Sequence, residues 1–430
     1  MSFTHWMRLR RGRALVRNRC CGVPVEGGRT PVAKPFPQQE RGRNIYSISR
    51  IQQVLQGLPR GAFQNAVDKH RGDRHCKGFT CWSHLVAMVY AQLAGVNSLR
   101  ELEAGFNQHR NHHYHLNTRP VHRTTLGDAN KKRNPDIFGD VLRELVQVAG
   151  RRIKHDREDI LYLLDSTSIA LRGRGSEWTK GGATRTPGLK VHVLYSSGQQ
   201  LPVRHTITPA NVNDVDEGRR LQIEPGATYV FDKGYCDYTW WSQINACGAR
   251  FVTRSKTNAA LRPISTNNVA TEAANTILSD QIVRFAHRSN RAGHRNQYQA
   301  DLRRIEVARP GQHSLVLLTN DLQTDAAQIA QLYKERWGIE LFFKWLKQHL
   351  RIKSFLGQTE NAVRIQLLTA LIAYVLVAIL NAATAGASLW TTLAQLRTGL
   401  FHRPHQDESW WRRRRRQQQI QTALQPGLFG

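Results

Sequence analysis

Residues 160–172 read ILYLLDSTSIALR, an almost unbroken apolar run that carries a single acid, Asp165. A short run rich in Ile, Leu and Tyr, bounded by polar and turn-forming residues, is typical of a β-strand buried in a sheet. An ionised carboxylate inside such a strand costs on the order of several kcal/mol unless it is paired or binds a metal. The stretch therefore predicts a sheet and, at Asp165, a site.

Shorter apolar or alternating runs follow this strand, separated by Gly, Ser and Asn. They are residues 190–195 (KVHVLY), 202–208 (PVRHTIT) and 228–231 (TYVF). A helical candidate, residues 216–221, precedes the last of them, so we predict three strands paired as hairpins and a crossover into a parallel fourth. Asp232 directly follows that fourth strand. If the first and fourth strands are neighbours, Asp165 and Asp232 lie at one edge of the sheet.

The chain then changes character. A helix at residues 240–248 and a strand at 250–253 are followed by a polar segment, residues 255–319, that is rich in Arg and Asn. Strand-like pieces recur within it, at residues 281–285, 297–307 and 314–318. We interpret the segment as a β-rich insertion in an α/β domain.

Residues 333–347, YKERWGIELFFKWLK, have the apolar spacing of a helix that packs on a core. At 3.6 residues per turn, Tyr333, Arg336, Glu340 and Lys347 fall within roughly 60° of one another and form one polar stripe. An ordinary amphipathic helix with salt-bridged charges has the same pattern. We expect Trp337 to pack against the core. Glu340 is the candidate third carboxylate beside Asp165 and Asp232.

Three carboxylates suit magnesium, which prefers hard oxygen ligands and keeps several waters. Two Mg²⁺ ions about 3.5–4 Å apart would support in-line displacement at a phosphodiester. Tyr333, Arg336 and Lys347 would then hold the nucleic acid by its phosphates. The charge balance agrees, because 62 Lys and Arg against 32 Asp and Glu give a formal net charge of +30, which favours nucleic acid as the partner.

The remaining segments complete the predicted organisation. Residues 1–44 are a disordered basic arm, 45–150 an all-helical domain that grips DNA, 151–385 the catalytic domain and 386–430 a basic tail. Histidines 109, 112, 113 and 115 lack partners at structural-zinc spacing, so phosphate contacts or plain surface are the favoured interpretation. The apolar run 367–380 is too short to cross a membrane and predicts a buried helix. The six cysteines form no C-x-x-C pair, which indicates a reducing compartment.

The motifs resemble those of the DDE transposases of bacterial insertion sequences. The likeness rests on the acid in LLDST, the acid in VFDKGY and the Y-x2-R-x3-E-x6-K spacing of residues 333–347, in this order. Within this family, the sequence resembles the cut-and-paste branch with the Tyr-Arg-Glu-Lys pattern. The resemblance covers about residues 45–385. The resemblance implies a ribonuclease H-like catalytic domain with a β-rich insertion, preceded in the chain by an all-helical DNA-binding domain.

The resemblance also implies roles. Asp165, Asp232 and Glu340 would hold two Mg²⁺ ions, with Mn²⁺ able to substitute, and Tyr333, Arg336 and Lys347 would contact the transposon-end backbone. A homodimer would bind terminal inverted repeats and target DNA in a synaptic complex in the cytoplasm, at the bacterial nucleoid, with no membrane involved. A hairpin intermediate is implied too, although relatives hold a flipped base with an aromatic of the insertion. Phe285 and Tyr298 are the only aromatics between Val252 and Leu332.

Two other functions fit the same sequence. A catalytically silent protein that only binds transposon ends would keep the basic surface, but the intact acids argue against it. A ribonuclease H-like nuclease would cut nucleic acid without joining it. The separate helical domain and the Tyr-Arg-Lys stripe favour binding to specific DNA ends.

Overall fold

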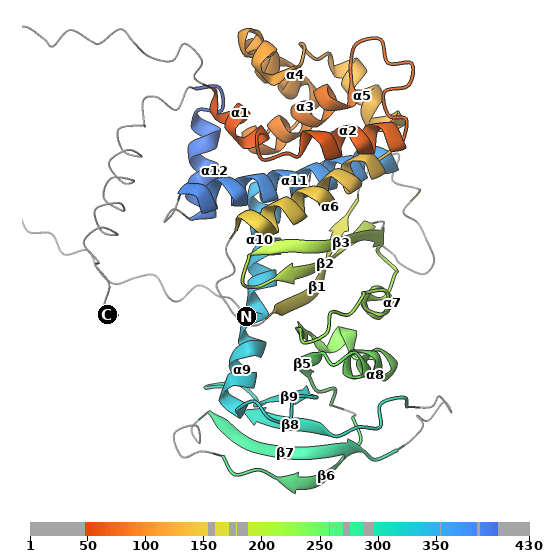
Figure 1. Cartoon of the computed structure of the whole chain (residues 1–430), viewed down its shortest axis with the longest axis vertical. Helices are drawn as coiled ribbons and strands as arrows, with labels where there is room; N and C mark the ends of the chain where they lie inside the picture. The colour runs from red at the N-terminus through yellow and green to blue at the C-terminus, as the bar shows by residue number, and fades with distance from the viewer. Residues whose placement is uncertain are drawn as a thin grey trace, which may run out of the picture. The chain divides into compact units, whose positions relative to one another are not determined.

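The computed structural model describes residues 48–153, 160–171, 178, 188–257, 259–269, 276–287, 296–352, 354–384 and 388–402 (Figure 1). The predicted basic arm and the arginine run 412–416 of the predicted tail lie outside these residues. The described residues belong to one compact unit. The predicted domain boundaries within that unit stay a prediction.

The sheet has nine strands in the order β3-β2-β1-β4-β5-β9-β8-β7-β6. Its first half is β1 (Leu161–Ala170), β2 (Gly188–Ser196), β3 (Leu201–Pro209), β4 (Thr228–Phe231) and β5 (Arg250–Arg254). Strands β1, β2 and β3 pair antiparallel, whereas β4 pairs parallel with β1 and β5 parallel with β4. Helix α7 (Asp214–Arg219) lies in the crossover from β3 to β4, and α8 (Tyr238–Ala246) in the crossover from β4 to β5. The predicted hairpins and the parallel fourth strand are confirmed.

The β-rich insertion extends the same sheet. It supplies β6 (Leu261–Thr266), β7 (Ile277–Phe285), β8 (Leu302–Val307) and β9 (Leu315–Thr319), all antiparallel to their neighbours. Strand β9 pairs with β5, so the insertion leaves from β5 and returns beside it. Figure 1 shows these strands at the lower end of the view. The α/β fold with a β-rich insertion is confirmed.

The N-terminal region is all helical, as predicted. It contains α1 (Arg50–Leu55), α2 (Arg60–Lys69), α3 (Cys81–Ala94), α4 (Leu99–Gln108), α5 (Arg123–Lys132) and α6 (Asp136–Arg152). The predicted cap of α4 forms, because Ser98 Oγ accepts a hydrogen bond from the Glu101 amide at 3.1 Å. Glu101 Oε2 in turn accepts from the Asn97 amide. Of the histidine cluster, His113 is buried and its Nε2 contacts the Phe106 carbonyl oxygen.

Two helices from the end of the chain pack among these N-terminal helices. They are α11 (Glu360–Thr384) and α12 (Leu389–Thr398). Helix α11 contacts α3, α5 and α6, and it runs beside α6 in Figure 1. Its length and composition would allow it to cross a membrane, but 83% of its most apolar window is buried inside the structure. Packing against neighbouring helices therefore accounts for its apolar sequence, as predicted for residues 367–380.

The helix predicted over residues 333–347 is divided at Arg336. Helix α9 (Ala326–Glu335) ends there and α10 (Trp337–His349) begins. The junction is bridged by i to i−3 hydrogen bonds, from the Arg336 amide to Tyr333 and from the Ile339 amide to Arg336, so the turn tightens locally without reversing direction. The expectation that Trp337 packs against the core is wrong, since 57% of this residue is exposed.

Candidate active site

Asp165 and Asp232 occupy neighbouring positions in the interior of the sheet, Asp165 in the middle of β1 and Asp232 directly after the end of β4, and not at an edge as predicted. In the parallel pairing of β1 with β4, Leu164 is opposite Phe231, and the two acids are the next residue of each strand. Because both strands run in the same direction, both carboxylates emerge at the same end. The structure thus brings these two predicted residues together.

Glu340 reaches the same place from α10. This helix packs on β1, and the fit is close at Gly338, where a side-chain Cβ would lie 3.3 Å from Leu163 Cδ1. Glu340 lies one turn beyond Arg336, and its Oε1 is 2.6 Å from Arg336 Nη2. Both Glu340 and Arg336 act electrostatically on Asp165. Glu340 is therefore electrostatically coupled to Asp165, while Asp232 is placed beside Asp165 by the pairing of β1 with β4.

The environment of Asp165 resists a negative charge. Burial, aided by the charges of Glu340 and Asp214, raises the pKa of Asp165 to about 6, against the lowering effects of the Ser166 amide and Arg336. The Ser166 amide donates to Asp165 Oδ1 at 2.8 Å. The protein therefore compensates only part of the negative charge of this carboxylate. A bound cation would offset the free energy that it still costs to keep the buried carboxylate ionised.

Replacing Asp165 with Asn should stabilise the metal-free protein at pH 8. The folded-state pKa lies above the ordinary value of 3.8, so the native carboxyl binds its proton more tightly than the unfolded chain does. That contribution is complete below about pH 4 and is lost as the pH rises through 6. We expect Asp165→Asn to raise stability by about 1–3 kcal/mol at pH 8, at 1.36 kcal/mol per pKa unit.

The measurement is the melting temperature of both proteins in EDTA between pH 4 and pH 8. The gain should shrink to nothing near pH 4, where the native Asp165 is already neutral. A gain that stays the same across this range would contradict the shift. The Asn side chain retains an oxygen that can accept from the Ser166 amide, so the comparison isolates the charge.

Asp232 is contacted by two groups. The Tyr333 hydroxyl donates to Asp232 Oδ1 at 3.4 Å, and Arg254 Nη1, from the end of β5, lies 3.9 Å from the same oxygen. Tyr333 is buried, and burial first of all raises the pKa of its phenol to about 12, so it acts as a neutral donor. The sequence predicted Tyr333 near the site but gave no sign of Arg254.

Lys347 lies further along α10, away from the acids. It lines a cavity of about 640 Å³ together with Ser168 of β1, with Leu171, which directly follows β1, and with Phe355 and Gln358, which follow α10. The four residues of the predicted polar stripe therefore do not gather at one place. Tyr333, Arg336 and Glu340 meet at the acids, and Lys347 borders the adjoining cavity.

The aromatics of the insertion do not approach a substrate surface. Tyr298 is only 2% exposed, and Phe285 packs on Tyr238 with ring centroids 4.3 Å apart. Both belong to the hydrophobic core around β4 and β5. Within the described residues, neither is placed to hold a base.

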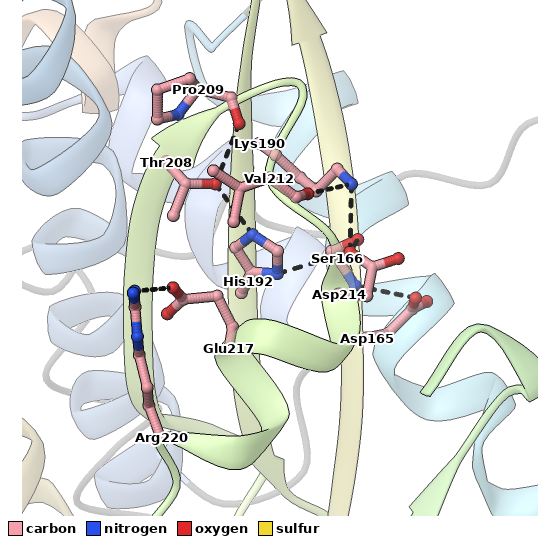
Figure 2. Close-up of polar contacts among 10 residues, drawn as sticks. All are labelled: Asp165, Ser166, Lys190, His192, Thr208, Pro209, Val212, Asp214, Glu217 and Arg220. Carbon is pink, nitrogen blue, oxygen red and sulfur yellow. Dashed lines mark hydrogen bonds and ion pairs between the residues drawn. The ribbon is translucent and has the colours of Figure 1, made fainter. Parts of the chain in front are cut away.

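Asp214 is an acid of this site that the sequence did not reveal. It begins α7, and its Oδ1 accepts from Ser166 Oγ at 2.8 Å and lies 3.2 Å from Lys190 Nζ (Figure 2). Lys190 and His192, both on β2, are turned towards Asp214 in this arrangement. Asp214 stands with two other acids, Asp216 and Glu217, in the first turn of α7, so no pattern in its segment distinguishes it.

In the part of the chain that the structure describes, no three His, Cys, Asp or Glu side chains come close enough to enclose a metal ion. Glu340 is instead paired with Arg336. The donor chemistry nevertheless fits a hard divalent cation, because all three acids are carboxylates and the protein leaves the charge of Asp165 only partly compensated. Asp165, Asp232 and Glu340 are the residues that could hold it.

Two family models match parts of the chain. Residues 156–376 match the transposase DDE domain, and residues 47–119 match a domain of unknown function. A putative transposase of Sinorhizobium fredii is 42% identical over 256 residues, which is 59% of this chain and 70% of the relative. A probable transposase for an insertion sequence element of Geobacillus stearothermophilus is 27% identical over 258 residues, 59% of this chain and 66% of the relative.

Among solved structures, the cryo-EM structure of the piggyBac transposase synaptic complex with hairpin DNA is similar. The TM-score is 0.44 at 10% sequence identity, and the match covers 81% of this chain and 77% of that chain.

Proposed function

Because the chain belongs to the DDE transposases, we propose that it binds the terminal inverted repeats of an insertion sequence and catalyses their Mg²⁺-dependent cleavage and transfer to target DNA. The observation that supports the proposal is that Asp165 and Asp232 are neighbours in the strand pairing and that Glu340 lies within electrostatic reach of Asp165. Two come from adjacent parallel strands and the third from a helix packed on one of those strands. We assign them as the catalytic, metal-holding residues.

Divalent metal use is general to this family, and we propose Mg²⁺, with two ions bound and Mn²⁺ able to replace it. When bound, the ions would activate the attacking water or 3′-hydroxyl and stabilise the leaving oxygen. The protein supplies the ligands. Burial of Asp165 favours this use, since a half-buried carboxylate whose pKa is about 6 gains much from a cation.

The cations of the site are suited to the DNA backbone. Arg336 carries a planar guanidinium, which binds phosphate oxygens in pairs, and here it neutralises Glu340. The Tyr333 hydroxyl donates to Asp232 and is a neutral donor next to the acids. Lys347 borders the adjoining cavity. We propose that these three residues hold the strand that is cut, and that the net charge of +30 attracts the rest of the duplex.

The assembly and the place of action extend the same proposal. Two copies of the chain would form a homodimer that holds both ends of the element in one synaptic complex. The reaction would take place in the cytoplasm, at the nucleoid.

The experiment is cleavage of a labelled duplex that carries the element's own ends. The full chain is incubated with Mg²⁺ or with EDTA, DNA binding is followed by gel shift, and joining is assayed on a supercoiled plasmid. We expect cleavage and joining only with Mg²⁺. Cleavage without joining would mean a nuclease. Binding without cleavage would mean a silent end-binding protein.

A further inference from the structure

Asp214 connects the crossover helix α7 to two strands. Its Oδ1 accepts from the Ser166 hydroxyl of β1 at 2.8 Å and lies 3.2 Å from Lys190 Nζ of β2 (Figure 2). Lys190 is itself fixed, because its Nζ donates to the Val212 carbonyl at 2.9 Å. The side chain of Asp214 is 27% exposed. It is therefore held by the protein from more than one side.

The imidazole of His192 also faces Asp214 (Figure 2). Its Nδ1 is 3.5 Å from Asp214 Oδ1 but lacks the geometry of a hydrogen bond. Its Nε2 lies 2.9 Å from the Thr208 hydroxyl, which donates to the Pro209 carbonyl. The hydroxyl is thus left to accept from Nε2, which places the imidazole proton on that nitrogen. Ser166 and Lys190 remain the two partners that fix Asp214.

Ser166 joins Asp214 to the catalytic site. The residue follows Asp165 in β1; its amide donates to Asp165 Oδ1, and its hydroxyl donates to Asp214 Oδ1, both at 2.8 Å. Successive side chains of a strand point to opposite faces of the sheet. Asp214 therefore acts on the backbone segment from which Asp165 projects, through the residue that also orients the Asp165 carboxylate.

The turn that follows Asp232 approaches the same carboxylate. A side-chain Cβ at Gly234 would lie 3.7 Å from Asp214 Oδ2. The next residue, Tyr235, is 1% exposed, and its hydroxyl has no hydrogen-bond partner of good geometry within the described ranges. Burial first of all, and then the charges of Asp214 and Asp165, raise the pKa of the Tyr235 phenol against a lowering effect of Ser166, so this hydroxyl lies within electrostatic reach of both acids. Asp214 thus lies against both segments that carry a catalytic Asp.

We propose that Asp214 is a positioning residue of the cleavage reaction. By holding Ser166 of β1 and packing beside the turn after Asp232, it keeps the Asp165 and Asp232 carboxylates at the separation needed to share a divalent cation. The role rests on the function proposed above. It assigns α7, a crossover helix, to the support of the active site.

The test compares Asp214→Asn and Ser166→Ala in the full chain, with two readouts. The first is the rise in melting temperature on titration with Mg²⁺ or Mn²⁺, which reports metal binding without any reaction. The second is cleavage of the labelled duplex as a function of Mg²⁺ concentration. Loss of a group that orients a metal ligand typically costs about 10- to 100-fold in metal affinity or activity. We expect the half-saturating Mg²⁺ concentration to rise by that factor in both variants, with DNA binding unchanged.

Three matched proteins complete the design. Ser166→Thr retains the hydroxyl and should restore wild-type metal binding. Asp216→Asn removes an exposed acid of the same helix, paired with Arg219, and should behave as wild type. The double variant Asp214→Asn/Ser166→Ala should be less impaired than the product of the two single effects, because both substitutions remove the same hydrogen bond between Ser166 and Asp214.

Several outcomes would overturn the role of Asp214. They are wild-type metal binding by Asp214→Asn, a defect in Asp214→Asn that Ser166→Ala does not share, or effects that multiply in the double variant. The variant Asp165→Asn distinguishes failure of the positioning role of Asp214 from failure of the proposed function. If that variant loses cleavage and the metal-induced shift while Asp214→Asn keeps both, only the positioning role is wrong. If Asp165→Asn retains both, the proposed active site itself is wrong.

Discussion

Glu340→Gln should lower the rate of DNA cleavage by at least about 10³-fold, on the order of 4 kcal/mol of transition-state stabilisation. Gln has the same shape as Glu but lacks the charge that a divalent cation requires. The substitution also removes the anionic partner that lies 2.6 Å from Arg336. DNA binding should be retained or become tighter, because Arg336 is then available to phosphate. The measurement is initial cleavage rate in Mg²⁺, with the dissociation constant for the same duplex.

The matched control is Glu335→Gln. Glu335 ends helix α9 five residues earlier, and its Oε2 accepts from the Ser197 hydroxyl at 3.0 Å instead of facing the acids. Cleavage by this variant should stay within about threefold of wild type, equivalent to roughly 0.7 kcal/mol. Equal loss in both variants would show that Glu340 acts on the stability of the helix and not on the reaction.

Arg303→Met should destabilise the protein by about 3–5 kcal/mol. Arg303 of β8 makes two bonds to Asp280 of β7, from Nε to Oδ1 at 2.9 Å and from Nη2 to Oδ2 at 2.6 Å. Only 7% and 3% of the two side chains are exposed. The substitution leaves a buried carboxylate without its counterion, and this uncompensated charge, more than the lost attraction, sets the cost. Chemical denaturation of the full chain measures it.

Two further variants test that reason. Asp280→Leu combined with Arg303→Met removes both charges and should recover most of the loss, because no buried charge is left unpaired. Arg284→Met breaks the ion pair between Arg284 of β7 and Asp301, which directly precedes β8, at the surface, where 47% of the Arg284 side chain is exposed. Solvent screens that pair, so we expect no resolvable change. A double variant as unstable as Arg303→Met would contradict this account.

The buried pair also attaches the insertion to the active site. A third nitrogen of Arg303, Nη1, donates to the Thr324 carbonyl, directly before Asp325, the N-cap of α9. Helix α9 carries Tyr333, whose hydroxyl contacts Asp232. Loss of Arg303 should therefore loosen the start of the helix that leads to Glu340, and cleavage should fall together with stability.

Much of the fold could be predicted because its strands are apolar and short. Strand β4 was predicted with the bounds that the structure gives, and the apolar run around Asp165 gave β1 within two residues. Strand β6 was missed. It lies at the edge of the sheet, and none of its residues, LRPIST, is buried, so no buried face imposes alternation. Pro263 also argues against a strand except at such an edge.

The division of the predicted helix into α9 and α10 at Arg336 was not predicted, for a different reason. The apolar spacing runs through residue 336 without a break, so periodicity predicts one helix. Gly338 is the only weak helix former close by, and its small size is needed where α10 meets Leu163 of β1. Contacts made by the folded protein, which no local pattern records, therefore decide where α9 ends.

The candidate site was predictable where an acid interrupts or ends an apolar strand. Asp165 and Asp232 have that signal, and Glu340 has helical spacing. Asp214 and Arg254 have none, because each reaches the site through a tertiary contact with a distant strand or turn. Lys347 had the right spacing, but distance along α10 separates it from the acids.

The ends of the described chain are joined, and this has a consequence for synthesis on the ribosome. The amides of Arg50 and Ile51 donate to the carbonyls of His402 and Leu400, and α11 packs against α3. Thirteen of the fourteen residues of α3 are buried. While the chain emerges, α3 must wait for more than 250 residues before α11 can cover it. A nascent chain stopped before residue 360 therefore exposes an apolar helix, and we expect it to be held by chaperones or degraded.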